Sequence, residues 1–155
     1  MQELDRLIAG SPLFAELTPV QLELVAGCAH NEHADAGAML FRQGDPASRF
    51  YLVRKGAIAL EVAAPGRDAL VIATLAEGEG VGWSWLFPPY RWQFDGRTTV
   101  AASLIAFDAA CLRGKCDADH QLGYLLMRRF AAAMVERLQA TRLQLLDVYG
   151  QPVAG

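Results

Sequence analysis

The chain has 155 residues, of which 53% are hydrophobic and 20% are charged, and these values are typical of one folded domain rather than of a disordered chain. Its net charge is −3 at pH 7, and its basic residues form no continuous stripe that could neutralise phosphates. We therefore expect no direct binding to nucleic acid. No apolar run approaches the roughly 18 to 20 residues of a membrane span, and the first residues do not read as a signal peptide, so we expect no membrane association.

The cysteines Cys28, Cys111 and Cys116 form an odd set without the spacing of a disulfide framework. Free thiols are typical of a reducing compartment, so we expect the protein in the cytoplasm. Two loose groups of possible metal ligands occur, Cys111 and Cys116 with His120, and Cys28 with two nearby histidines. Neither group offers the four closely spaced ligands of a structural zinc site, so we predict no metal.

Residues 1–30 are expected to form the N-terminal helices. Thr18 can cap a helix and Pro19 stands at the tolerated first position, which predicts a helix over residues 19–28. Leu22, Val25 and Ala26 recur at helical spacing within it. The apolar face of this helix should therefore pack on the core.

Residues 31–108 are expected to form the β structure. From Ala38 onward apolar residues alternate with small or polar ones, as at Phe50 and Leu52 and again at Ile58 and Leu60. The apolar segments are separated by glycine-containing groups of the kinds that favour turns. This pattern predicts an antiparallel β-roll or jelly roll, and a fold class that is mainly β with flanking helices (α+β).

The helical period returns with a short helix at residues 109–116 and a long helix at residues 117–148, which Asp117 or Asp119 can cap; residues 149–155 form a tail. Apolar positions along the long helix follow the spacing of a coiled-coil seam. They are Met127, Ala131, Met134, Leu138, Thr141, Leu145 and Val148. A helix of about 30 residues extends some 45 Å, longer than so small a domain is wide, so we predict a homodimer rather than a helix packed only on its own domain.

Several glycines lie at fixed spacing between residues 37 and 60. Gly37 precedes an apolar segment, Gly44-Asp45 forms a turn, and Gly56 separates an aromatic-apolar segment from alternating aliphatic residues. Because hairpin turns at these points require glycine, the spacing is specific. The pattern resembles the cyclic nucleotide-binding domain family, which includes the sensor domains of Crp/Fnr regulators. The resemblance extends over nearly the whole chain and implies one domain, residues 1–155.

In that family a glycine-glutamate pair opens a short helix whose N–H groups face the cyclic phosphate, the glutamate binds ribose, and a downstream arginine pairs with the phosphate. Here Gly82 matches the glycine, whereas Trp83 replaces the glutamate. Arg91 lies near the family's spacing and Arg97 fits its Arg-Thr motif, so both are candidates. The resemblance thus implies a ligand pocket formed by Gly82, Trp83, Ser84, Trp85, Arg91, Trp92, Arg97 and Thr98.

The aromatic residues of this segment allow more than one interpretation. In the first interpretation they line a remodelled pocket for a flatter, less charged ligand. In the second they fill the space where the family binds its ligand, so that no small molecule binds. The third alternative is an ordinary cyclic nucleotide such as cyclic AMP, which is the ligand that the resemblance implies. The residues indicate no other cofactor.

No arrangement of a nucleophile with a histidine and an acid is recognisable, so we predict no catalytic residues and no enzymatic activity. The few residues after the long helix are too short for the helix-turn-helix of Crp/Fnr regulators. The sequence therefore predicts a stand-alone regulatory sensor that binds a small-molecule effector and signals, through a helix-mediated homodimer, to an unidentified protein. The alternative is a ligand-free dimeric scaffold.

Overall fold

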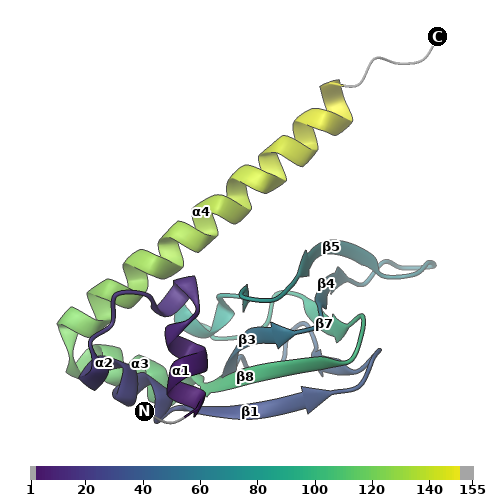
Figure 1. Cartoon of the computed structure of the whole chain (residues 1–155). Coiled ribbons are helices and arrows are strands. Elements are labelled where there is room, and N and C mark those ends of the chain that lie inside the picture. The colour runs from purple at the N-terminus through teal and green to yellow at the C-terminus, as the bar shows by residue number, and fades with distance from the viewer. Residues whose placement is uncertain (1–2, 151–155) are drawn as a thin grey trace.

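The computed structural model describes the backbone of residues 3–150 and the side chains of residues 3–147. Eight strands form two antiparallel four-stranded sheets, one in the order β1-β8-β3-β6 and the other in the order β2-β7-β4-β5 (Figure 1). The strands are β1 (Ala29–Ala34), β2 (Met39–Phe41), β3 (Arg49–Lys55), β4 (Ile58–Val62), β5 (Leu70–Leu75), β6 (Gly80–Val81), β7 (Asp95–Thr98) and β8 (Ala102–Asp108). The expected fold class, an antiparallel β-roll with flanking helices, is confirmed.

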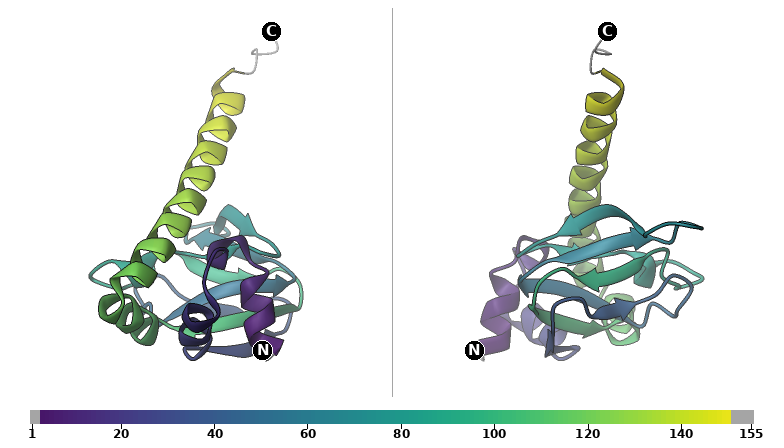
Figure 2. Two further views of the ribbon diagram at one scale, coloured as in Figure 1. Left: turned by 60° about the vertical axis from the view of Figure 1, so that its left-hand side comes forward. Right: turned by 90° about the vertical axis from the view of Figure 1, so that its right-hand side faces the viewer.

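The N-terminal helices pack at one end of the roll (Figure 2). They are α1 (Glu3–Ala9), the short 3-10 helix η1 (Pro12–Phe14) and α2 (Pro19–Ala26). Thr18 caps α2 as predicted, because its side chain accepts a hydrogen bond from the Gln21 N–H while the Gln21 side chain accepts one from the Thr18 N–H. The helix ends two residues earlier than expected, at Ala26.

Strand β1 begins two residues before the point where we expected the β structure to start. Its sequence is mostly polar, and its side chains are largely exposed because it forms the outer edge of its sheet and pairs only with β8. A strand in that position needs no alternating apolar residues. The roll therefore begins at Ala29 rather than at residue 31.

Glycine allows two of the tight turns that the sequence predicts. Gly44 has a φ of +91° and Gly56 a φ of +90°, a left-handed conformation that other residues adopt at a cost. At Gly56 a Cβ atom would also lie 2.6 Å from the Ala101 carbonyl oxygen. The turn between β3 and β4 therefore requires glycine for two independent reasons.

Two helices follow the roll, α3 (Ala109–Ala118) and α4 (His120–Gly150). Asp108 caps α3 by accepting a hydrogen bond from the Cys111 N–H at 2.7 Å, and Asp119 accepts one from the Leu122 N–H at 3.2 Å at the start of α4. The break between the helices thus lies at Asp119, whereas we expected the long helix to begin at residue 117.

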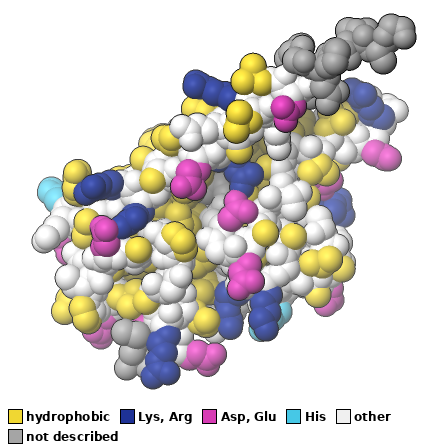
Figure 3. Space-filling view, turned by 45° about the horizontal axis from the view of Figure 1, so that its top comes forward, with side chains coloured by type: hydrophobic (Ala, Val, Ile, Leu, Met, Phe, Trp, Pro, Cys, Tyr) yellow, Lys and Arg dark blue, Asp and Glu magenta, His cyan; other side chains and the backbone are white. Residues whose placement is uncertain are grey.

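The first half of helix α4 packs against α3 and η1, and the end of the helix extends beyond the roll (Figure 1). Leu122, Leu126 and Phe130 are fully buried against the domain. An exposed apolar stripe runs along another face of α4, and hydrophobic side chains are visible between charged ones on this side of the molecule (Figure 3). We define the α4 stripe as Tyr124, Met127, Ala131, Val135, Leu138 and Leu145.

The α4 stripe differs from the expected seam at two positions. Met134 is partly buried against the core, so Val135 takes its place on the exposed face. Thr141 lies on the side of the helix that faces the roll. The side chain of Val148, the last expected seam residue, lies outside the described residues.

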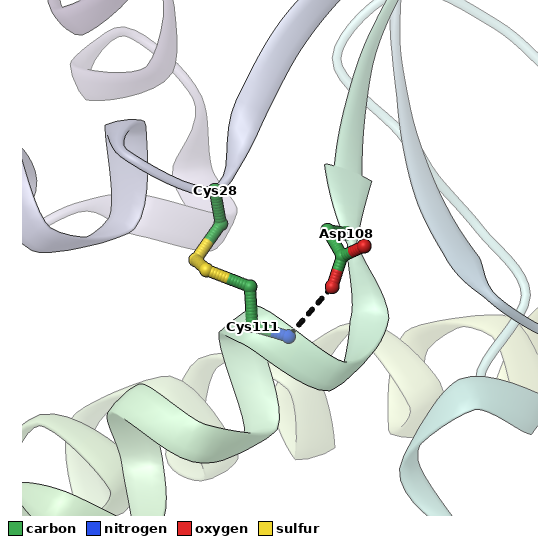
Figure 4. The surroundings of a disulfide bond; sticks show 3 residues. All are labelled: Cys28, Asp108 and Cys111. Carbon is green, nitrogen blue, oxygen red and sulfur yellow. Dashed lines mark hydrogen bonds between the residues drawn. A yellow bond between two sulfur atoms is a disulfide. The ribbon is translucent and has the colours of Figure 1, made fainter.

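A disulfide joins Cys28 to Cys111, contrary to the expectation of free thiols (Figure 4). The two residues are 83 positions apart, yet their Cα atoms lie within 5.7 Å. Cys28 immediately precedes β1, its carbonyl oxygen accepts a hydrogen bond from the Asp108 N–H, and Cys111 follows in the first turn of α3. The pairing of β1 with β8 thus brings both cysteines to the same end of the sheet, and Cys116 is the free cysteine.

Among the described residues, no group of three or more His, Cys, Asp or Glu side chains is placed to hold a metal ion. The described helices likewise include none that is both long and apolar enough to cross a membrane.

Candidate functional site

A cavity of about 540 Å³ lies between the roll and α4. Strands β4, β5 and β6 contribute one wall, residues 82–94 contribute a second, and α4 closes one side with Arg137 and Thr141. Most of the lining is hydrophobic. It includes Leu60, Ile72, Leu75, Phe87, Trp92 and Phe94.

Residues 82–94 enter the site at Gly82, whose φ is +75°. The ring of Trp92 lies against this glycine, so that a Cβ atom at position 82 would be 2.7 Å from the ring. Trp92 also stacks on Phe41, with ring centroids 3.6 Å apart and planes 9° apart. Trp92 is almost fully buried, and it therefore fills the interior of the roll in front of Gly82.

Trp83, the residue in place of the family's glutamate, connects the roll to α4. Its ring centroid lies 5.4 Å from that of Phe50 on β3 and 5.2 Å from that of Phe130 on α4. Trp83 also lines the cavity. Trp83 is therefore in contact with both the core and the cavity.

The structure places the two candidate arginines in different surroundings. Arg91 lines the cavity, and its Nη1 donates a hydrogen bond to the Gly44 carbonyl oxygen at 2.9 Å. Arg97 lies on β7, where it donates to Glu61 Oε1 at 2.9 Å and to the Gly37 carbonyl oxygen at 3.2 Å, and it does not line the cavity. Of the two candidates, Arg91 is the one that faces the cavity.

Of the other predicted site residues, some line the cavity and others do not. Ser84 lines the cavity together with Gly82 and Trp92. Trp85 is fully buried in the aromatic core and does not line the cavity. The buried Thr98 hydroxyl serves the backbone, since it donates to the Asp35 carbonyl oxygen at 2.5 Å and accepts from the Ala38 N–H at 2.8 Å.

Sequence reasoning missed Arg137 as a site residue. Its guanidinium forms an ion pair with Glu79, in the turn before β6, and so attaches α4 to the roll beside the cavity. Glu79 is itself held by a hydrogen bond that its Oε1 accepts from the Ala76 N–H at 3.1 Å. No local motif marks Arg137, because the side of α4 that faces the roll depends on how the helix docks.

Residues 82–94 are attached to α3 as well. Arg113 donates a hydrogen bond to the Trp85 carbonyl oxygen at 2.5 Å, and its guanidinium lies over the Tyr90 ring, 4.1 Å from the centroid. Both of these contacts are made by the side chain of Arg113. Helix α3 therefore holds residues 82–94, which form one wall of the cavity, while α4 forms another side of the cavity.

The family model described as the cyclic nucleotide-binding domain matches residues 31–119, which is more than half of the chain. The chain belongs to the cyclic nucleotide-binding domain family. This confirms the resemblance to the sensor domains of Crp/Fnr regulators, and domains of this family are regulatory rather than catalytic.

Solved structures of cyclic nucleotide-binding domains share the fold. A Geobacter metallireducens protein assigned to the cyclic nucleotide-binding proteins is 26% identical, with a TM-score of 0.78, over 89% of this chain and 99% of that one. The catabolite activator protein of Thermus thermophilus is 25% identical, with a TM-score of 0.69, over 90% of this chain and 63% of that one. The sensor domain of the regulator DNR from Pseudomonas aeruginosa is 21% identical, with a TM-score of 0.71, over 89% of this chain and 95% of that one. No curated protein matches the sequence.

Proposed function

We propose that this cyclic nucleotide-binding domain is a non-enzymatic sensor that binds a small molecule in the cavity between the roll and α4. The observation that carries the proposal is that α4 both lines the cavity, through Arg137 and Thr141, and bears the exposed α4 stripe. A ligand that contacts α4 changes the free energy of its docking on the roll. Occupancy of the cavity is thereby coupled to how two copies pair along the stripe.

Pairing of two copies is supported by the exposure of the α4 stripe. Val135 and Leu138 are 50% and 51% exposed in the single chain. Burying such side chains in a helix-helix interface stabilises the complex.

Three features argue that the ligand is not an ordinary cyclic nucleotide. Trp83 offers no carboxylate to a ribose hydroxyl, Arg97 is paired with Glu61, and the ring of Trp92 lies in front of Gly82. A nucleotide bound in the cavity would therefore bury its ribose hydroxyl groups without a carboxylate partner and would compete with Trp92 for the space in front of Gly82, which costs free energy.

The stacking of Trp92 on Phe41 favours a second candidate function, a ligand-free scaffold dimer. In this alternative the aromatic residues serve only the core, and α4 pairs two copies independently of any small molecule. The open cavity beside Arg91 favours the sensor over the scaffold.

The cytoplasmic location stays a prediction, and its basis is weaker than the sequence indicated. It rested on unpaired cysteines, whereas Cys28 and Cys111 form a disulfide, and disulfides persist mainly in oxidising compartments.

Thermal unfolding in the presence of small molecules tests the sensor. We expect no shift in Tm with cyclic AMP, cyclic GMP or cyclic di-GMP, and a shift with at least one compound from a chemically varied set. A ligand at 100 times its Kd adds about 2.7 kcal/mol of stability. Ile72→Trp, which fills the cavity, should abolish that shift, whereas Val71→Trp on the neighbouring, non-lining position of β5 should preserve it. If no compound shifts Tm, the scaffold is the better description; a shift with cyclic AMP would refute the argument against nucleotides.

A further inference from the structure

The walls of the cavity are hydrophobic, and part of that surface is open to solvent. Ile72 and Phe87 line the cavity and are 44% and 59% exposed. Large apolar side chains left in contact with water mark a surface that gains free energy when it is covered. Their position at one cavity favours a ligand with a substantial apolar part.

The charged groups at the cavity are all of one sign. Within the described residues its lining includes Arg91 and Arg137 and contains no Asp, Glu, Lys or His. Arg137 is already neutralised by Glu79. Arg91 forms no ion pair with a described residue; its one hydrogen bond to a carbonyl oxygen leaves most of its five donors available.

A guanidinium that retains its charge and a planar set of donors suits a carboxylate, which it can bind through two parallel hydrogen bonds. The remaining polar side chains at the cavity are few, namely Ser84, Gln93 and Thr141, and the Thr141 hydroxyl already donates to the Arg137 carbonyl oxygen. A sugar or a polar heterocycle would therefore bury more hydrogen-bonding groups than the walls can satisfy. One anionic group on an otherwise apolar molecule fits both observations.

The cavity volume indicates the size of ligand that the walls would enclose. If each heavy atom takes roughly the 30 Å³ that a water molecule occupies in the liquid, the cavity of about 540 Å³ corresponds to about 18 heavy atoms. We propose that the ligand is a medium-chain hydrophobic carboxylic acid whose carboxylate binds Arg91 and whose chain lies along Ile72 and Phe87. This inference rests on the proposed function, since it assigns a ligand class to the same cavity.

Calorimetric titration with matched ligands tests the ligand class. Decanoate should bind with one molecule per chain, and decanamide, which has the same chain and no charge, should bind at least tenfold more weakly. Arg91→Gln should reduce the affinity for decanoate to that for decanamide and leave decanamide binding unchanged. Arg67→Gln, an exposed arginine in the turn between β4 and β5, is the matched control and should bind decanoate as the wild type does.

Three outcomes would overturn the inference: equal affinity for the acid and the amide, no effect of Arg91→Gln, or several molecules bound per chain. The experiments distinguish a wrong ligand class from a failure of the proposed sensor function. If decanoate does not bind but another compound shifts Tm in a manner that Ile72→Trp abolishes, the ligand class is wrong and the sensor stands. If no compound does so, both proposals fall.

Discussion

The ring of Trp92 lies so close to Gly82 that a single added methyl group at position 82 would be 2.7 Å from it. Gly82→Ala should therefore displace Trp92 from its stack on Phe41 and also strain a backbone with a φ of +75°. We expect a loss of about 1 to 3 kcal/mol in the free energy of unfolding, measured by urea denaturation. Gly114→Ala in α3 is the control, because open space surrounds that position and alanine favours a helix. Equal stabilities of the two variants would contradict the contact.

The Cys28–Cys111 disulfide should contribute strongly to stability because it closes a long loop. For two residues 83 positions apart, the loss of chain entropy in the unfolded state corresponds to at most about 4 to 5 kcal/mol. Cys28→Ser should lower the free energy of unfolding by about 2 to 4 kcal/mol, and dithiothreitol should lower that of the wild type to the same value.

Cys116→Ser is the control for the disulfide. Because Cys116 is free, this variant should keep nearly the stability of the wild type and the same sensitivity to dithiothreitol. A wild-type protein whose unfolding is unaffected by the reductant would show that the bond does not contribute.

The α4 stripe predicts which substitutions separate a dimer. Leu138→Arg should give a monomer in sedimentation velocity, because it places a charge in the middle of the apolar surface. Gln139→Arg introduces the same side chain at the next exposed position, off the stripe, and should leave the dimer intact. Retention of the dimer by Leu138→Arg would refute pairing along this face.

The reactivity of Cys116 should depend on pH in a defined direction. Burial raises the pKa of the Cys116 thiol, and the nearby carboxylates of Asp117 and Asp119 raise it further. Because the thiolate is the nucleophile, alkylation by iodoacetamide at pH 8 should be slower than for a cysteine in an unfolded peptide, and should rise at higher pH. Asp117→Asn should speed the reaction at pH 8 and the distant Asp68→Asn should not; labelling followed by mass spectrometry reports the single free thiol.

The roll could be predicted well from the sequence because the turns and caps that define it depend mainly on residues close together in the chain. Gly44 and Gly56 adopt a positive φ in turns of a few neighbouring residues, and Thr18 caps α2 through Gln21, which is only three residues away. Only the start of strand β1 was placed wrongly, because an exposed edge strand needs no apolar alternation that would mark where it begins. These successes and this failure have the same cause, since local patterns report only local requirements.

Five of the eight residues that the resemblance implied for a ligand pocket line the cavity, namely Gly82, Trp83, Ser84, Arg91 and Trp92, and ligand binding there stays a prediction. The sequence could not choose between Arg91 and Arg97, because which arginine faces the cavity depends on how residues 82–94 fold. Arg137 and the pairing of Cys28 with Cys111 depend on contacts between segments far apart in the chain. The offset from Met134 to Val135 in the α4 stripe likewise depends on how α4 rotates when it docks.

The disulfide makes the roll a covalent macrocycle that runs from residue 28 to residue 111 and contains every strand. A protease that cuts once within this ring, for example after Arg67 in the turn between β4 and β5, does not release a fragment. It produces a permuted roll whose new ends lie at the cut, with the N-terminal helices and α4 still joined through sulfur. Such a nicked molecule keeps its full size in electrophoresis until it is reduced, and then separates into two pieces.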